Sequence, residues 1–257
     1  SLHYYVHPEG WEIKGSATQF DDAVWYKTMS KALFMDELIR RHGAIMDVYD
    51  PDKKIGMIVD EWGTWYTVVP GTNPGFLYQQ NTMRDALVAA ITLNIFNKHS
   101  DRVKMANLAQ IVNVLQAVLL TDGDKMIKTP TYHVFNMYKY HQDSMLLDSS
   151  IETELIGVDD TYQVPNLSES VSLDKDGVMH ITVANLSTDT AYPVGADLGR
   201  FAGTQISAQI LTGEIHDMNT FEAPETVHVQ DFNGVAKTQD GVSFTIPASS
   251  VIHIAVK

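Results

Sequence analysis

The stretch that decides the fold is KIGMIVDEWGTWY, residues 54–66. Its first half, Lys54–Val59, is a short apolar run of the kind expected for a parallel strand that is covered on both faces. Glu61 follows the run, and aromatic residues that could offer ring faces to sugar C–H groups come directly after it. A carboxylate just past an apolar parallel strand lies on the face where such folds hold their active sites. We therefore expect Glu61 to be the nucleophile or the acid of a glycosidase; the alternative is that it bonds a neighbouring loop.

Strand-like and helix-like segments alternate on both sides of this stretch. Leu2–Val6 is a predicted strand, and Phe20–His42 is a predicted helix that Gly43 should end. The other predicted elements are helices over 78–96 and 130–141, and a helix within 105–120 that leads into another strand. This order predicts parallel strands joined by crossover helices over residues 1–142.

From about residue 143 the pattern changes to short runs in which apolar and polar residues alternate. Val178–Val183 and Val242–Ile246 show this alternation, and Val251–Val256 is a predicted closing strand. Turn dipeptides stand beside the first two runs, at Asp176-Gly177 and Asp240-Gly241. Residues 143–257 are therefore predicted to form an antiparallel β-sandwich domain.

The composition excludes several function classes. The 257 residues carry a net charge of -14 with only 18 Lys and Arg, and no basic run argues for nucleic acid or for an anionic membrane surface. The absence of cysteine rules out disulfides, zinc-thiolate sites and thiol catalysis. Neither a paired metal-ligand spacing nor a phosphate loop nor a serine-hydrolase elbow occurs. We expect a neutral substrate, no metal or cofactor, and a cytoplasmic protein.

Two residues of the first strand are candidate partners of Glu61. His3 and Tyr5 stand two positions apart, so both side chains should lie on the same side of the strand. Tyr5 could then hydrogen-bond the nucleophile carboxylate. The alternative is that both residues belong to the core with satisfied polar atoms.

The first half of the chain is too short for a closed barrel. It supplies about three strands, whereas a (β/α)₈ barrel needs eight. Three parallel strands alone would leave an apolar sheet edge exposed. The chain also opens with SLHYY, without Met, as though within a strand. We expect the C-terminal part of a larger barrel; a small open α/β domain is the alternative.

Residues 58–66, IVDEWGTWY, resemble the nucleophile motif of glycoside hydrolase family 51. Further segments match the family in order: SLHYY at 1–5 and MANLAQIVNVLQ at 105–116 resemble barrel strands, TPTYHVFNMY at 129–138 resembles the final barrel helix, and LTG at 211–213 with NTFEAP at 219–224 resembles the C-terminal sandwich. Together the matches cover essentially the whole chain, and five ordered matches are more specific than any one of them.

The resemblance implies the C-terminal portion of a (β/α)₈ TIM barrel followed by a jelly-roll-like β-sandwich. It implies a retaining, exo-acting α-L-arabinofuranosidase that releases terminal arabinofuranosyl groups from arabinan, arabinoxylan or arabino-oligosaccharides. Glu61 would be its nucleophile, and His3, Tyr5 and Trp65 would bind the sugar. It also implies an enzyme without metal or cofactor that assembles as a homo-oligomer, commonly a hexamer.

The sequence departs from the family pattern in two respects. The family's acid/base glutamate lies in an Asn-Glu pair, and no Asn-Glu dipeptide occurs here. Retention requires a second carboxyl group about 5–5.5 Å from the first, so we expect an N-terminal half to supply it and the isolated chain to be inactive. Some members carry Gln where this chain has Thr129.

The alternative functions are a retaining glycosidase for another sugar and a non-catalytic carbohydrate-binding or assembly module.

Overall fold

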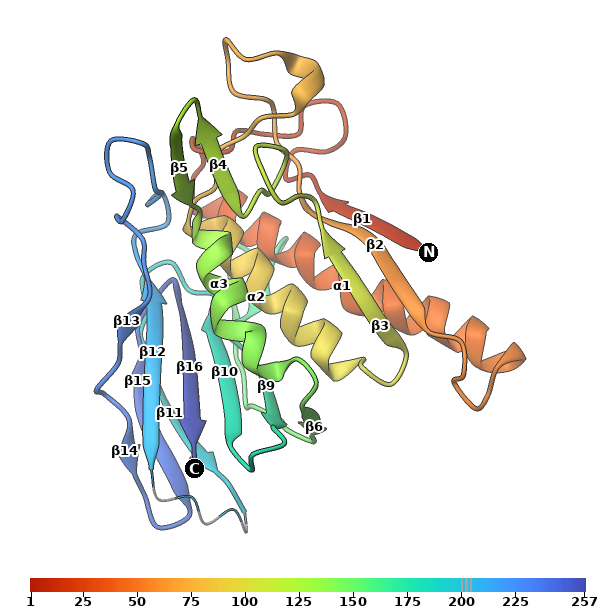
Figure 1. Cartoon of the computed structure of the whole chain (residues 1–257), viewed down its shortest axis with the longest axis vertical. Coiled ribbons are helices and arrows are strands. Elements are labelled where there is room, and N and C mark those ends of the chain that lie inside the picture. The colour runs from red at the N-terminus through yellow and green to blue at the C-terminus, as the bar shows by residue number, and fades with distance from the viewer. Residues whose placement is uncertain (200, 202, 204) are drawn as a thin grey trace.

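The computed structural model describes residues 1–199, 201, 203 and 205–257. Helices occupy the middle of the molecule, with a parallel sheet on one side and antiparallel sheets on the other (Figure 1). Strands β1 (Leu2–Val6), β2 (Met57–Thr64) and β3 (Val103–Leu108) pair in parallel in that order. Helices α1 (Asp22–Tyr49) and α2 (Met83–Lys98) connect them. The prediction of parallel strands joined by helices is confirmed.

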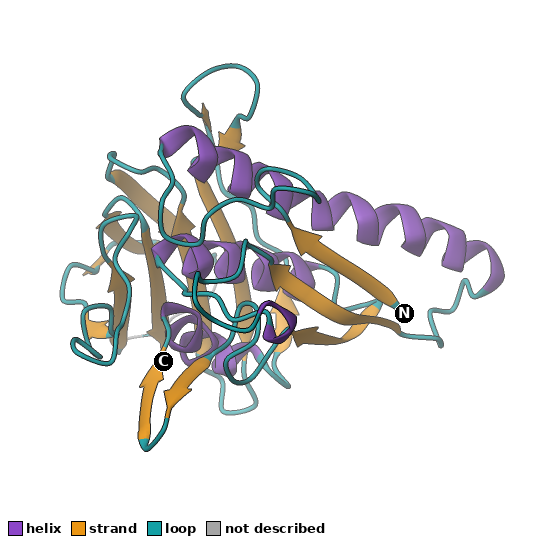
Figure 2. Cartoon of the chain, turned by 90° about the horizontal axis from the view of Figure 1, so that it is seen from above, coloured by secondary structure: helices purple, strands orange, loops and turns teal. Residues whose placement is uncertain are grey.

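Helix α1 is longer than predicted. Gly43 does not end it but is buried within it. The helix continues to Tyr49 and ends at Asp50, whose backbone N–H donates to Met46 O, and Pro51 follows directly. Proline cannot continue a helix, and it disfavours helical backbone in the residue before it. As a result, α1 projects beyond the parallel sheet on the side of the N-terminus (Figure 2).

The predicted start of the second helix is also wrong by several residues. The sequence pattern placed it at Tyr78, but α2 begins after Thr82, which caps it. Thr82 accepts from the backbone of the first turn, and the Asp85 carboxylate accepts from Thr82 N in return. This capping box satisfies backbone donors that the helix itself leaves unpaired.

The helix expected within residues 105–120 is absent from that fully described segment. Instead β3 ends at Leu108, an irregular segment follows, and β4 (Leu119–Asp122) pairs with β5 (Lys125–Lys128) in a hairpin. Asn113 and Leu115 have φ of 59° and 54°, a left-handed conformation that no right-handed helix contains. The apolar run was misinterpreted because a buried strand and a buried helix look alike over a short apolar stretch.

The remaining helical segments are short. They are η1 (Pro74–Phe76), α3 (Pro130–Tyr138) and η2 (Lys139–His141). The last two span the predicted helix 130–141, which is confirmed. Proline at the first position of α3 is favourable because its ring fixes a helical φ and its missing N–H would be unpaired there anyway.

The second half of the chain forms antiparallel sheets. The larger has the order β13-β12-β16-β10-β9-β6 and the smaller β11-β15-β14. Their strands are β6 (Met145–Leu147), β9 (Leu167–Leu173), β10 (Met179–Asn185), β11 (Tyr192–Asp197), β12 (Ile206–Thr212), β13 (Gln230–Asp231), β14 (Ala236–Lys237), β15 (Gly241–Ile246) and β16 (Ser250–Val256), with a separate pair β7 (Leu155–Ile156) and β8 (Val164–Pro165). The predicted antiparallel strands and the turn at Asp176-Gly177, between β9 and β10, are confirmed.

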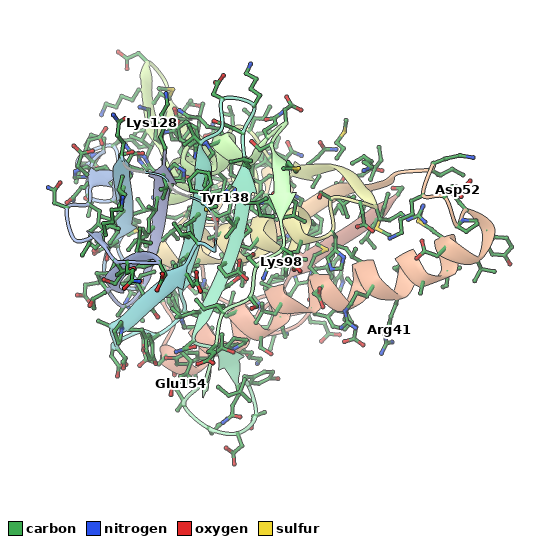
Figure 3. The ribbon with its side chains drawn as sticks, turned by 90° about the horizontal axis from the view of Figure 1, so that it is seen from below. Arg41, Asp52, Lys98, Lys128, Tyr138 and Glu154 are labelled. Atoms are coloured by element: carbon green, nitrogen blue, oxygen red, sulfur yellow. The ribbon has the colours of Figure 1, made fainter. Side chains whose placement is uncertain are left out.

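The central strands of the larger sheet, β10 and β16, are buried on both faces. Ile181 and Val183 of β10 join Phe244 of β15 in a core shared by the two antiparallel sheets. The opposite face packs on the helices, where Trp25 Nε1 donates to Leu186 O at 2.9 Å. Lys98 and Tyr138 lie where the helices meet this sheet (Figure 3), and Lys98 Nζ is 2.6 Å from Glu169 Oε1 of β9. The helices are therefore held between the parallel and the antiparallel sheets.

Candidate active site

A β-bulge in β2 turns Glu61 toward the face of the parallel sheet that the helices leave open. From Val59 to Glu61 strand β2 advances by two residues, while β1 advances by one, from Leu2 to His3. The pairing with β3 has the same irregularity between Val59 and Trp62. Val59 and Trp62 both belong to the core beneath the helices, so the extra residue shifts the alternation of side chains and leaves Glu61 on the other face. Glu61 thus lies within the strand, not just past it as predicted.

Two side chains of β1 contact the Glu61 carboxylate. The Tyr5 hydroxyl donates to Glu61 Oε2 at 2.7 Å, and His3 Nδ1 lies 3.6 Å from the same oxygen. The His3 and Glu61 side chains are 51% and 48% exposed, so His3 is not the core residue that the alternative interpretation requires. Tyr4, between them, points the other way and donates to Lys31 O of α1 at 2.7 Å.

The phenol of Tyr5 is held in its protonated form. Partial burial, and then the hydrogen bond and the negative charge of Glu61, raise the pKa of Tyr5 well above its ordinary value. An ionised carboxylate has no proton to donate, so in this pair the hydroxyl is the donor and the carboxylate is the acceptor. The pair is therefore suited to orienting one carboxylate oxygen while leaving the second for chemistry.

Trp65 lies beside this pair, in the segment that follows β2. Its backbone N–H donates to Val6 O at 3.0 Å, which ties the segment to β1. Its ring meets the Tyr5 ring edge to face, with centroids 5.1 Å apart. The structure therefore brings together the four residues predicted from the sequence: Glu61, His3, Tyr5 and Trp65.

A buried polar network beneath this segment escaped the sequence analysis. Thr64 N–H donates to Gln116 Oε1 at 2.8 Å, and Thr64 Oγ1 donates to Asp85 Oδ1 at 2.6 Å. Tyr66 N–H donates to Gln79 Oε1 at 2.8 Å. Burial raises the pKa of Asp85 above its ordinary value. The network fixes the backbone on either side of Trp65. In the sequence, the Thr-x-x-Asp pattern at 82–85 was the feature that could have pointed to Asp85.

The loop after β1 adds two rings that the sequence analysis also missed. His7 and Trp11 lie 5.6 Å from the Trp65 ring, measured between centroids. The sequence could have indicated them by their position, because loops at the carboxyl ends of parallel strands line the sites of such folds.

Thr129, the other position singled out in the sequence, is buried as the N-cap of α3, and its hydroxyl donates to Ala117 O at 2.8 Å.

Within the described residues, no three His, Asp or Glu side chains are grouped so as to hold a metal ion. In the same part of the chain, no helix combines the length and the apolar character that crossing a bilayer requires.

Comparisons with known proteins point to one family. Residues 60–250 match a family profile described as "Alpha-L-arabinofuranosidase C-terminal domain". An intracellular exo-α-L-arabinofuranosidase of Bacteroides ovatus is 44% identical over 259 residues, which cover 100% of this chain and 50% of that protein. An exo-α-(1→6)-L-arabinofuranosidase of Bifidobacterium longum is 25% identical over 277 residues, covering 100% and 52%.

Solved structures agree with the sequence relatives. The crystal structure of a family 51 arabinofuranosidase from Xanthomonas axonopodis pv. citri superposes with a TM-score of 0.97 at 46% identity, covering 99% of this chain and 52% of that one. An α-L-arabinofuranosidase from Thermotoga maritima, solved as an arabinose complex, has a TM-score of 0.76 at 25% identity, covering 99% and 51%. The chain thus spans about half the length of the relatives that it matches.

Proposed function

This chain belongs to the α-L-arabinofuranosidase C-terminal domain family of glycoside hydrolase family 51, and from that premise we propose that it is the nucleophile-bearing half of an exo-acting, retaining α-L-arabinofuranosidase. The family predicted from the motif around Glu61 is confirmed. The substrate would be the terminal arabinofuranosyl group of arabinan, arabinoxylan or an arabino-oligosaccharide. One observation carries the proposal: the Glu61 carboxylate, within the matched region, stands on the open sheet face and accepts from Tyr5.

In the first step we expect a carboxylate oxygen of Glu61 to bond to the anomeric carbon as the bond from that carbon to the leaving oxygen breaks. A general acid gives its proton to the leaving oxygen, and the released glycan departs. In the second step water attacks the anomeric carbon as its ester bond to Glu61 breaks, which restores the Glu61 carboxylate. A proton of the water passes to the same acid/base group, and arabinose leaves with its configuration retained. His3, Tyr5 and Trp65 would bind the arabinofuranosyl ring.

The second carboxyl group is proposed to come from outside these 257 residues. In the described part of the chain, the side chains in polar contact with Glu61 are Tyr5 and His3, and neither is a carboxylic acid. Loss of a general acid alone costs about 10²–10⁴-fold in rate. We therefore expect the isolated chain to be inactive, and an N-terminal half to supply both the acid and the remaining substrate contacts.

The architecture of the whole enzyme follows from the same premise. Residues 1–142 would be the C-terminal part of a (β/α)₈ barrel, with β1, β2 and β3 as three of its strands, and residues 143–257 a jelly-roll-like sandwich. We also propose a cytoplasmic homo-oligomer, such as a hexamer, that needs neither metal nor cofactor. The name of the Bacteroides ovatus relative, which calls it intracellular, supports the location.

The test uses the complete protein that contains this chain, assayed on a panel of nitrophenyl glycosides. Arabinofuranoside hydrolysis, with NMR showing the product first formed in the anomeric configuration of the substrate, is the expected result. Preference for another glycoside would indicate a glycosidase of different specificity. Absence of hydrolysis with retained glycan binding would indicate a carbohydrate-binding module instead.

A further inference from the structure

Trp11 is a large aromatic side chain that remains mostly exposed on an otherwise well-anchored loop. It is 65% exposed. The loop is held from two sides: Lys31 Nζ of α1 donates to His7 O at 2.6 Å, and Thr67 N–H donates to Gly15 O at 2.9 Å. Lys14 Nζ donates to Trp11 O at 2.8 Å and lies 4.8 Å from the centre of its ring. The ring is therefore presented to solvent on a fixed support.

The position of Trp11 continues a line of aromatic rings that starts at the nucleophile. Tyr5 contacts Glu61 directly, and the Trp65 ring follows 5.1 Å beyond the Tyr5 ring. The Trp11 ring comes next, 5.6 Å beyond Trp65 at an angle of 66°. The tilt means that the two tryptophans do not stack on each other, so much of the outer ring stays open.

An enzyme that removes a terminal sugar must hold the rest of the glycan farther out than the ring it cleaves. In this line Trp65 is the ring nearer to Glu61, and Trp11 is the outer and more solvent-exposed one. Aromatic rings bury apolar area at low conformational cost, which suits them to the C–H face of a neutral sugar. The chain is strongly acidic, but the substrate carries no charge that this would repel.

We propose that Trp11 is a binding platform for the second sugar of the substrate, on the leaving-group side of the bond that Glu61 attacks. This inference rests on the proposed function. It assigns Trp65 to the arabinofuranosyl ring that is released and Trp11 to the sugar next to it. Trp11 thereby discriminates between glycans and small arabinofuranosides and takes no part in bond breaking.

The experiment compares two substrates in the complete enzyme. In methyl α-L-arabinofuranoside the leaving group is a single carbon and cannot reach Trp11, whereas arabinotriose places a sugar there. Trp11→Ala should lower kcat/KM for arabinotriose about tenfold, chiefly through KM, and leave the methyl glycoside within about twofold. Trp11→Phe, which keeps a ring, should recover part of the loss. An equal loss on both substrates, or no loss on either, would overturn the inference.

Tyr49→Ala is the matched control, because Tyr49 is 85% exposed at the end of α1 and should change neither substrate. Calorimetry of arabinotriose binding to Glu61→Gln protein separates this inference from the function on which it rests. If adding Trp11→Ala weakens arabinotriose binding about tenfold, the platform is supported even if the wild-type enzyme prefers another glycoside. Equal affinity with and without Trp11 refutes the platform even if arabinofuranoside hydrolysis is observed.

Discussion

Tyr5 of β1 donates a hydrogen bond of 2.7 Å to Glu61 of the adjacent parallel strand β2. Its direct neighbour in the β1–β2 register is Gly63, and the carboxylate lies two positions back along β2. Gly63 has φ of 141°, and a Cβ there would come within 3.2 Å of Gln116 Oε1. The glycine therefore allows the close approach of Gln116 from the buried network.

Removing the Tyr5 hydroxyl should impair catalysis without unfolding the protein. In Tyr5→Phe the ring keeps its contact with Trp65, but Glu61 loses its donor. A hydrogen bond to a charged group contributes about 1.5–3 kcal/mol, so kcat/KM of the complete enzyme should fall about 10- to 150-fold. Steady-state kinetics on an aryl arabinofuranoside measure it, with Tm as the check on folding. A value within twofold of wild type would refute an orienting role.

Glu61→Gln should abolish turnover. The amide keeps the size of the side chain but cannot form a glycosyl ester. Glu37→Gln makes the same chemical change on the surface of α1, where only an ion pair with Arg41 is lost, and should leave the rate unchanged. Mass spectrometry of the protein after brief reaction with a slow 2-fluoro arabinofuranoside should find the sugar on the peptide that contains Glu61. Labelling of a different peptide would show that the nucleophile is elsewhere.

Asn94 should be among the most sensitive positions for stability. Its Oδ1 accepts from the hydroxyls of Tyr138 at 2.9 Å, Ser170 at 3.0 Å and Thr182 at 3.2 Å, all buried between α2 and the larger sheet. Asn94→Leu leaves the Tyr138 hydroxyl without its acceptor and removes one of the partners of the Ser170 and Thr182 hydroxyls. A buried polar group that loses its partner costs about 1–3 kcal/mol. Urea denaturation should show a drop of several kcal/mol. Asn136→Leu, which loses one exposed bond to Lys139, should change stability little.

Stability should decline on mild acidification because of buried histidines. Burial first, and then the neighbouring His180, lower the pKa of His141 to about 4. Burial first, and then His180, His141 and Lys139, lower the pKa of His253 to about 3. Unfolded histidine titrates near 6.5, so below that pH the unfolded chain binds more protons than the folded one. The stabilising effect of the neutral form is complete above 6.5. It is lost toward pH 4 at up to about 1.4 kcal/mol per pH unit for each histidine.

Urea titrations at several pH values between 7 and 4.5 check this prediction. His253→Phe should keep the stacking on Tyr140, whose ring lies 4.8 Å away, and reduce the pH slope by about one proton. An unchanged slope would mean that His253 is not responsible.

The parts of the fold that could be predicted from the sequence are those determined by neighbouring residues in the chain. Leu2–Val6 and the helix at Pro130 were predicted well, because alternation and an N-terminal proline are local features. The end of α1 was missed because glycine, although frequent just past helix ends, is also tolerated inside a helix, and the sequence alone does not distinguish the two positions. The segment 105–120 was assigned to a helix because apolar content does not specify backbone conformation.

The candidate site was predictable where it depended on motif and spacing. His3 and Tyr5 were expected on one side of a strand, and they meet Glu61 there. Trp11 and Asp85 were missed because a loop and a helix from elsewhere in the chain bring them in. No pattern in the sequence indicates that β2 holds an extra residue before Glu61.

That extra residue decides which face of the sheet each later side chain of β2 occupies. If β2 paired with β1 without the bulge and kept Asp60, unbroken alternation from Val59 would turn Glu61 inward beneath the helices, and Trp62 would take the outward place. Every side chain would still be present, yet the strand would display an indole where the carboxylate belongs. A single-residue insertion or deletion in this strand, other than removal of the bulged residue, would therefore exchange the two faces of the strand beyond it, whereas a point substitution would not.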